Sequence, residues 1–208
     1  MISSETINDY LGRLASRQPT PGGGAAAALH AAQGAALVAM VARFSTGAKY
    51  EQHQDIITRT ISAADALIVE ALRLADADEH AFQDVIGSYK LPAGSDAERE
   101  ARSLAIQEAL VRAAEPPTAL IALSGAVVDL ASDLLDIANP NVISDVAAAA
   151  DAARAAASTA RVNIDINVVA VNDIQTRKAL QDRTGGLAEK VMLSADTLSD
   201  AVRERILR

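Results

Sequence analysis

Asp78 is the residue of this chain best placed for chemistry, because a carboxylate interrupts an otherwise apolar helical face. From Ile57 the apolar residues recur at steps of four and three through positions 61, 64, 68, 71 and 75, and after Asp78 the pattern continues with Phe82 and Val85. An ionised carboxylate buried on such a face costs several kcal/mol unless a partner compensates it. Burial also raises a carboxyl pKa toward the range useful for general acid or base catalysis. We therefore predict that Asp78 carries a catalytic proton.

The same pattern allows a second interpretation, in which the helix ends or kinks near Asp76. Asp78 would then lie in solvent and would have no special chemistry. Asp76, Glu79 and His80 fall off the apolar face. We interpret these three side chains as solvated, or as neighbours that support the site from outside.

A proline- and glycine-rich loop comes before the most apolar stretch of the chain. It reads Pro19-Thr20-Pro21-Gly22-Gly23-Gly24, and the helix that follows is expected from about Gly24 to Ser45. Unpaired N–H groups and the positive end of a helix dipole at this point favour an anion or a polar ring edge. A tight turn between helices is the alternative. No Lys-Ser or Lys-Thr pair follows the glycines and no strand precedes them, so the common phosphate and dinucleotide loops are excluded.

Two asparagines form the third candidate feature. Asn163 and Asn167 are four residues apart, on one face of a long alanine-rich segment. Their amides are suited to the edge of a heteroaromatic ring. Spacing alone fits equally well with bonds to other helices or to solvent.

Composition limits the class of protein. The chain has 208 residues, 50% of them hydrophobic but only 2% aromatic, and it contains no cysteine. A net charge of -8 argues against a nucleic-acid partner, and the absence of cysteine excludes disulfides and thiolate ligands. Met1 to Asp9 lacks the pattern of a secretory signal, so we expect a cytoplasmic location. The apolar run from Ala25 to Val41 is expected to be a buried helix rather than a membrane span.

The expected architecture is all-α, a single domain over residues 1–208 built as a bundle of long alanine-rich helices, without strands. Small side chains let helices pack closely. We expect a first helix capped by Ser3 or Ser4, a capping box at Ser95 and Glu98, and a long helix capped by Ser144 with Asp145 in its first turn. The other expected bounds are 96–115, 118–138 after Pro116-Pro117, and 173–208 with a break at Gly185-Gly186.

The succession of motifs resembles the formiminotetrahydrofolate cyclodeaminase and methenyltetrahydrofolate cyclohydrolase family, which includes short stand-alone bacterial proteins. The resemblance extends from about Glu5 to Asn172. It rests on six motifs in order: Pro-Thr-Pro-Gly-Gly-Gly, Asp76-Ala77-Asp78 with Ala81-Phe82, Tyr89-Lys90-Leu91-Pro92, 105–110 (AIQEAL), Asn139-Pro140-Asn141 with Ser144-Asp145, and Val162-Asn163 with Ile166-Asn167.

The resemblance implies a homodimer with folate sites at or near the subunit contact, and Asp78 as the catalytic residue. The positions that it places around the folate are Pro21, Gly22, Gly23, Gly24, Ser144, Asp145, Asn163 and Asn167. Many relatives carry two or three basic residues between positions 46 and 50, where this chain has only Lys49, which we also assign to folate binding. No metal and no cofactor beyond the tetrahydrofolate substrate is implied.

The sequence leaves the reaction open. In cyclodeamination a protonated acid assists the departure of ammonia from the carbon that bridges N5 and N10, and in cyclohydrolysis a base takes a proton from the attacking water. A stand-alone chain without a fused transferase favours the hydrolase slightly. A catalytically silent dimer that binds folate or a partner helix is the alternative. A carboxylate-bridged metal bundle is disfavoured, because no Glu-x-x-His pair occurs and His30, His53 and His80 lack ligand spacing.

Overall fold

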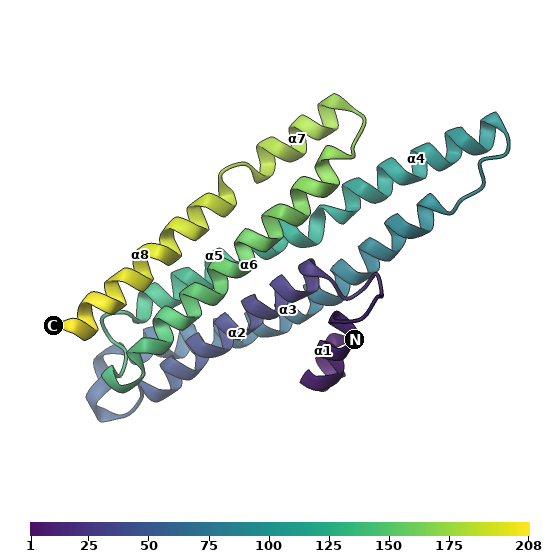
Figure 1. Cartoon of the computed structure of the whole chain (residues 1–208). Helices are drawn as coiled ribbons and strands as arrows, with labels where there is room; N and C mark the ends of the chain where they lie inside the picture. Colours follow the sequence, from purple (N-terminus) through teal and green to yellow (C-terminus); the bar gives the residue numbers. More distant parts are fainter.

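The computed structural model describes all 208 residues and contains helices and no strands, which confirms the predicted all-α class. Long helices run side by side in an elongated bundle, and the helices share one core of 48 buried residues (Figure 1). The α-helices are α1 (Ile7–Leu14), α2 (Gly23–Phe44), α3 (Gln54–Tyr89), α4 (Asp96–Ala113), α5 (Glu115–Leu134), α6 (Ile143–Val169), α7 (Ile174–Thr184) and α8 (Leu187–Leu207). Short 3₁₀ turns occupy Ile2–Ser4, Ala48–His53 and Pro140–Val142.

The second helix is the centre of the bundle, as its composition predicts. α2 packs mainly against α3 and α6 and also contacts α5. Small side chains permit this close packing: a Cβ on Gly34 would lie 3.0 Å from the Ala149 carbonyl oxygen and 3.2 Å from a methyl group of Val127. Alanine and glycine therefore determine how near the three neighbouring helices can come.

α2 and the continuous segment Asp96–Leu134 are long and apolar enough to span a membrane by length and composition. Within α2, 61% of the most apolar 18-residue window is buried inside the bundle. Packing against α3 and α6 therefore accounts for the hydropathy of α2, as the sequence predicts.

α3 is one uninterrupted helix of 36 residues. The alternative in which it ends or kinks near Asp76 is therefore wrong. Ile57, Ala64, Ala71 and Ala75 are buried as the apolar pattern predicts, but Phe82 is 44% exposed. The reason is that α2 begins at Gly23, next to Asp78, so no residue of α2 covers α3 beyond that point.

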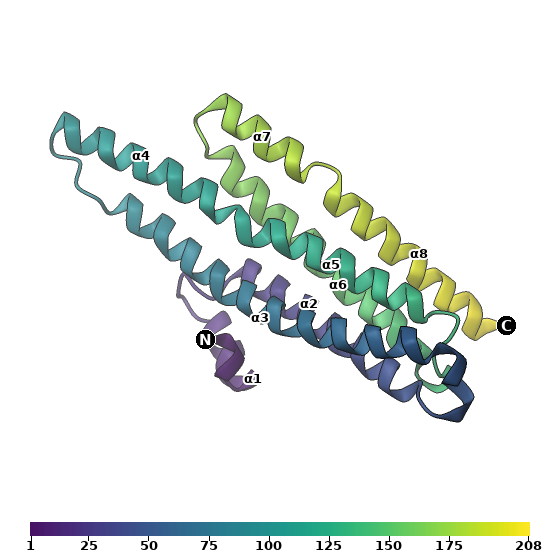
Figure 2. The ribbon, with the colours of Figure 1, turned by 180° about the vertical axis from the view of Figure 1, so that it is seen from behind.

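α4 and α5 are nearly one helix. The predicted capping box is present, with the Ser95 hydroxyl accepting from the Glu98 N–H and the Glu98 carboxylate accepting from the Ser95 N–H. Pro116-Pro117 does not reset the chain, because both prolines occupy the first turn of α5, where no N–H donor is needed. The two helices continue in the same direction (Figure 2), so α5 begins at Glu115 rather than at Thr118.

Two predicted caps are wrong. Ser144 does not cap α6, because the helix already begins at Ile143, after a 3₁₀ turn, and Ser144 lies exposed in its first turn. Asp145 is in that first turn, as predicted. Ser3 and Ser4 do not cap α1, since a 3₁₀ turn contains them and the Thr6 hydroxyl accepts from the Asp9 N–H instead.

α1 lies beside the bundle rather than within it (Figure 1). Only Tyr10 of its apolar face is buried, whereas Ile7 and Leu11 are exposed. The amphipathic pattern of residues 7–14 thus predicts the helix correctly, but not how much of its face the rest of this chain covers.

The close approach of α2 and α6 gives a first testable prediction. Gly34→Ala inserts a methyl group against a backbone carbonyl, and overpacking of this kind costs about 1–3 kcal/mol. Gly87→Ala is the matched control, because Gly87 is also helical and its added methyl group would have no atom within 4 Å. Chemical denaturation should give a free energy of unfolding lower for Gly34→Ala than for Gly87→Ala by about 1–3 kcal/mol. Equal stabilities would contradict the proposed packing limit.

Candidate active site

Asp78 lies against the first turn of α2, where the glycine loop ends. A Cβ built on Gly24 would fall 2.2 Å from a carboxylate oxygen of Asp78 and 2.3 Å from its Cγ. Only glycine at position 24 leaves room for this carboxylate. The structure therefore brings together two features that the sequence pattern marks independently, on helices whose contacting residues are far apart in the chain.

The first turn of α2 supplies unpaired donors next to the carboxylate. The helix begins at Gly23 after Gly22, with no side-chain cap of its own, and the Gly23, Gly24 and Ala25 N–H groups precede the first helical hydrogen bond, from Ala26 to Gly22. Asp78 thus occupies the place at the helix N-terminus that a capping carboxylate would take.

The pKa of Asp78 is raised from 3.8 to about 6, chiefly because burial removes the carboxylate from water. The Ala25 N–H opposes this shift, and the negative charge of Glu79 adds to it. Desolvation thus outweighs the helix terminus. A carboxyl group with a pKa near 6 is populated in both protonation states near neutral pH, so it can give or take a proton.

Asn163 and Asn167 form the wall of the site on α6. Gly23 faces Asn163, since a Cβ at Gly23 would lie 3.6 Å from the Asn163 amide nitrogen. The Asn163 amide donates to the Thr159 carbonyl, and the Asn167 amide donates to the carbonyls of Asn163 and Ala113. Asn167 uses both N–H donors of its amide on the backbone, whereas Asn163 uses one, so the two side-chain oxygens and one Asn163 N–H remain for a ligand.

Asp76 and Glu79 anchor the N-terminal segment beside the site. An Asp76 oxygen accepts from the Ile2 N–H at 2.8 Å, and Arg13 bridges Glu79, at 2.9 Å, and Glu5. Neither carboxylate is freely solvated, so the interpretation of these two as solvated side chains is wrong. Glu79 contributes its charge to the pKa of Asp78 and is itself paired with Arg13.

Comparison with known proteins identifies the family. The family model described as formiminotransferase-cyclodeaminase matches residues 6–185. The chain belongs to the formiminotransferase-cyclodeaminase family. The methenyltetrahydrofolate cyclohydrolase of Methylorubrum extorquens is 35% identical to it over 207 residues, which cover 99% of this chain and 98% of that protein.

Two further relatives show how much of each matched protein this chain covers. The formimidoyltransferase-cyclodeaminase of Rattus norvegicus is 28% identical over 96% of this chain, but the chain spans only 37% of that protein. The crystal structure of formiminotetrahydrofolate cyclodeaminase from Thermotoga maritima superposes with a TM-score of 0.87 at 26% identity, covering 99% of this chain and 100% of that chain.

The residues that the family resemblance implies separate into two groups within one subunit. Asp78, Gly23, Gly24 and Asn163 meet at the start of α2, and Asn167 lies one helical turn beyond Asn163 and donates to its carbonyl. Ser144 and Asp145 lie in the first turn of α6, about 28 Å along the helix from Asn163. Lys49 follows the C-terminal end of α2 and is exposed at the same far end of the bundle.

Several groups at the site have no signal in the sequence. The Ala25 N–H and the Ala113 carbonyl are backbone groups, and no residue type reveals them. Thr20 is buried in the loop and its hydroxyl accepts from Gln83 of α3 at 3.4 Å. Arg13 has an ordinary position in an amphipathic helix, so its bond to Glu79 could not be predicted from local spacing.

The contact between Gly24 and Asp78 gives the second prediction. Gly24→Ala forces the Asp78 carboxylate away from the first turn of α2, because the added methyl group takes its place. Turnover should fall by about 10²-fold or more, since misplacing a reacting group by about 1 Å costs that much.

Gly23→Ala is the matched control, because its added methyl group would make only ordinary contacts, at 3.6 and 3.8 Å. It should keep most of the activity. Equal losses in the two variants would show that the loop needs glycine for another reason.

Proposed function

We propose that this protein is a folate one-carbon enzyme that acts at the N5/N10 bridge of tetrahydrofolate, as a methenyltetrahydrofolate cyclohydrolase. The reaction converts 5,10-methenyltetrahydrofolate and water to 10-formyltetrahydrofolate. The observation that carries the proposal is the Asp78 carboxyl, held against the first turn of α2 with its pKa raised to about 6. The Methylorubrum extorquens relative, matched over nearly its whole length, supports the choice of the hydrolase.

The proposed mechanism uses Asp78 twice. Its ionised carboxylate takes a proton from the water that attacks the methenyl carbon, which gives a tetrahedral carbon bridging N5 and N10. The bond from this carbon to N5 then breaks as Asp78 returns the proton to N5, and the hydroxyl proton of the former water passes to solvent as the formyl C=O forms. General acid–base catalysis of this kind contributes about 10²–10⁴ in rate. The reaction as written needs no metal and no cofactor beyond the folate.

The remaining site residues position the substrate. The Gly23 and Gly24 N–H groups are donors at the site, and the Asn163 and Asn167 side-chain oxygens are acceptors. A pterin ring presents both donors and acceptors along its edge, so this set is complementary to it. Orientation of the bridge against Asp78 supplies the rest of the acceleration.

Formiminotetrahydrofolate cyclodeaminase is the second candidate function, favoured by the likeness to the Thermotoga maritima structure. The two reactions need opposite forms of Asp78. Hydrolysis starts from the carboxylate, so kcat/KM should fall as pH drops through about 6, whereas deamination starts from the protonated acid, so kcat/KM should fall as pH rises through about 6. Loss of the methenyl chromophore and release of ammonia measure the two activities separately.

The third prediction concerns Asp78→Asn. The amide keeps the size of the side chain but cannot exchange the proton, so the turnover number should fall by about 10²–10⁴. Affinity for an unreactive folate analogue should stay near that of the wild type. Asp76→Asn is the control: Asp76 holds the Ile2 N–H rather than the substrate, so its effect on turnover should be much smaller. The assignment fails if Asp76→Asn abolishes turnover and Asp78→Asn does not.

The same variant tests the burial of the carboxyl. Because the folded protein holds the Asp78 proton more tightly than the unfolded chain, the stability that Asp78 contributes is greatest below pH 3.8 and is lost as pH rises through about 6. A shift of about two pKa units corresponds to about 3 kcal/mol. Asp78→Asn should therefore raise the free energy of unfolding at about pH 8 by up to about 3 kcal/mol, and this gain should disappear below about pH 4.

We also propose a cytoplasmic homodimer that uses the exposed face of α2 and α6. Val162, Ile166 and Val169 recur at steps of four and three on α6 and are exposed, and Met40 and Phe44 on α2 are incompletely covered. The two helices pack together and lie on the same side of the bundle (Figure 1). Exposed apolar side chains along the end of α6, together with Met40 and Phe44 at the other end of the same face, are typical of a subunit contact.

A two-fold dimer with antiparallel α6 helices would also account for the separation of the implied folate residues. One subunit's Ser144 and Asp145 would then approach the other subunit's Gly23 and Asn163. A self-complementary contact of this kind is the commonest arrangement in homodimers. The active site would be completed by both chains.

The fourth prediction is a test of this contact. Ile166→Asp places a charge on this exposed face, so the protein should sediment as a monomer at micromolar concentration where the wild type sediments as a dimer. Leu193→Asp on α8 is the control, since Leu193 is 68% exposed and Ile166 is 71% exposed. It should leave the dimer intact. A monomeric wild type would contradict the proposal.

A further inference from the structure

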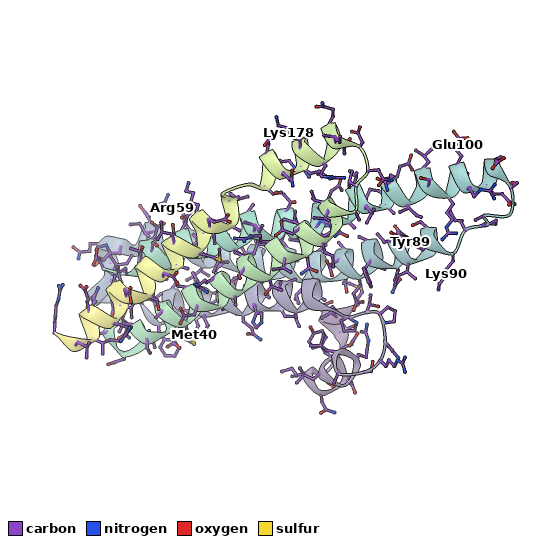
Figure 3. The ribbon with its side chains drawn as sticks, turned by 45° about the horizontal axis from the view of Figure 1, so that its top comes forward. Met40, Arg59, Tyr89, Lys90, Glu100 and Lys178 are labelled. Carbon is purple, nitrogen blue, oxygen red and sulfur yellow. The ribbon has the colours of Figure 1, made fainter.

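A second polar cavity lies beyond Asp78, between the ends of α3 and α4 and the segment that joins α6 to α7. It has a volume of about 390 Å³. Its wall includes Tyr89 from α3, Arg99, Arg102 and Ile106 from α4, and Ala170 after α6. Figure 3 shows Tyr89 and Lys90 at the end of α3, close to the turn into α4.

Two helices, α3 and α4, carry residues at helical spacing from the site to this cavity, and the segment after α6 closes its far end. On α3, Asp78, Phe82, Val85 and Tyr89 follow one another at steps of four, three and four. On α4, counting back from the Ala113 carbonyl that Asn167 contacts, positions 109, 106 and 102 share one face. On α6, the residue after the helix end, at position 170, is hydrogen-bonded through its backbone to Asn167. The cavity itself begins at Tyr89 and Ile106. α3 and α4 pack against each other, so their two faces lead from Asp78 to the cavity at position 102, and we call this path the groove.

Two exposed aromatic side chains lie on α3 along this path. Phe82 and Tyr89 are two of only five aromatic residues in the chain, and they are 44% and 50% exposed. Phe82 lies one helical turn beyond Asp78. If the carbon that bridges N5 and N10 lies at Asp78, an aromatic ring attached to N10 would lie near Phe82. Exposed aromatic rings at this spacing offer a stacking surface.

Arg102 is an unpaired cation at the far end. Its side chain is half-buried and its guanidinium makes no ion pair and no hydrogen bond within the chain. The nearby acids are already engaged, because Asp96 pairs with Arg99 and the Glu98 carboxylate accepts from the Gly94 and Ser95 N–H groups. A guanidinium left free in a cavity favours a carboxylate or phosphate ligand.

The wall opposite Arg102 is held in place. Gln107 accepts from the Asn172 N–H at 2.6 Å and donates to the Ala170 carbonyl at 3.4 Å. These bonds fix α4 to the segment after α6. The cavity is therefore a defined feature of the fold and not a gap between independent helices.

We propose that this groove binds the aminobenzoyl-glutamate arm of the folate, with Phe82 against the aromatic ring and Arg102 on the glutamate carboxylates. Asp78 and Tyr89 are about 16 Å apart along α3, and Arg102 and Ala113 are about 16 Å apart along α4. An aromatic amide followed by one or two extended glutamates is of this scale. The inference rests on the proposed function, and it assigns the tail to Arg102 rather than to Lys49.

The test compares substrates that differ only in the tail. Methenyl derivatives of tetrahydropteroate, which ends at the aminobenzoate, of the monoglutamate and of the pentaglutamate are converted by the wild type, Arg102→Gln and Arg102→Lys. Arg102→Gln should raise KM for both glutamate-bearing substrates about tenfold, because one charge-assisted hydrogen-bonded contact is lost. It should leave KM for the tetrahydropteroate derivative and kcat at saturation unchanged. Arg102→Lys should recover part of the loss.

Two further variants separate a general effect of charge from a specific tail site. Arg59→Gln removes an exposed arginine of α3 that bonds only to the Asp55 carbonyl, and it should change none of the three KM values. Lys49→Gln tests the competing assignment. The proposal is overturned if Lys49→Gln alone removes the preference for glutamate, or if Arg102→Gln weakens all three substrates equally.

Failure of the proposed function has a different signature. If the wild type converts none of the three methenyl compounds, the cyclohydrolase assignment fails. Calorimetric binding of tetrahydrofolate pentaglutamate to the wild type and Arg102→Gln still decides the tail site in that case. Equal affinities there would refute the assignment to Arg102.

Discussion

The contact between the start of α2 and the Asp78 carboxylate is the constraint on which the rest of the structure depends. A glycine at position 24 is required for this contact, and the first unpaired N–H groups of α2 face a carboxylate that the packed helices remove from water. Two opposing effects meet there. Burial raises the pKa of Asp78, and the helix terminus lowers it, so the group settles near 6 rather than at either extreme. A residue with that pKa can transfer a proton efficiently only if the site also holds the reacting atom of the substrate close to its carboxyl group.

The point at which α2 begins also shapes the binding surface. Because α2 starts at Gly23, it covers the part of α3 that precedes Asp78 and leaves the part beyond Asp78 uncovered. Phe82 is exposed for this reason, although its spacing is that of a core residue. The position at which α2 begins thus accounts both for the burial of Asp78 and for the exposure of Phe82. The alanines and glycines of α2 and α6 contribute to both outcomes, since they let the neighbouring helices come close enough to exclude water around Asp78.

The N-terminal segment lies beside the bundle, yet it is hydrogen-bonded to α3 next to Asp78. Asp76, two residues before Asp78, holds the Ile2 N–H, and Glu79, the residue after Asp78, holds Arg13. These bonds engage the two carboxylates nearest to Asp78 along α3, and Glu79 keeps part of its influence on the Asp78 pKa. The N-terminal segment therefore holds both carboxylates that flank Asp78 on α3.

The sequence by itself determined the helical class, the continuous apolar face of α3 with a carboxylate at Asp78, and the Ser95–Glu98 capping box, because each of these depends on residues within a few turns of one another. It also determined the family, since six weak motifs in order are specific. Only the tertiary structure decided that Asp78 faces Gly24, that Phe82 is uncovered, that Ser144 and Lys49 lie far from Asn163 within one subunit, and that Arg102 is unpaired. These facts depend on how helices distant in the chain are placed against one another, and local spacing carries no information about that placement.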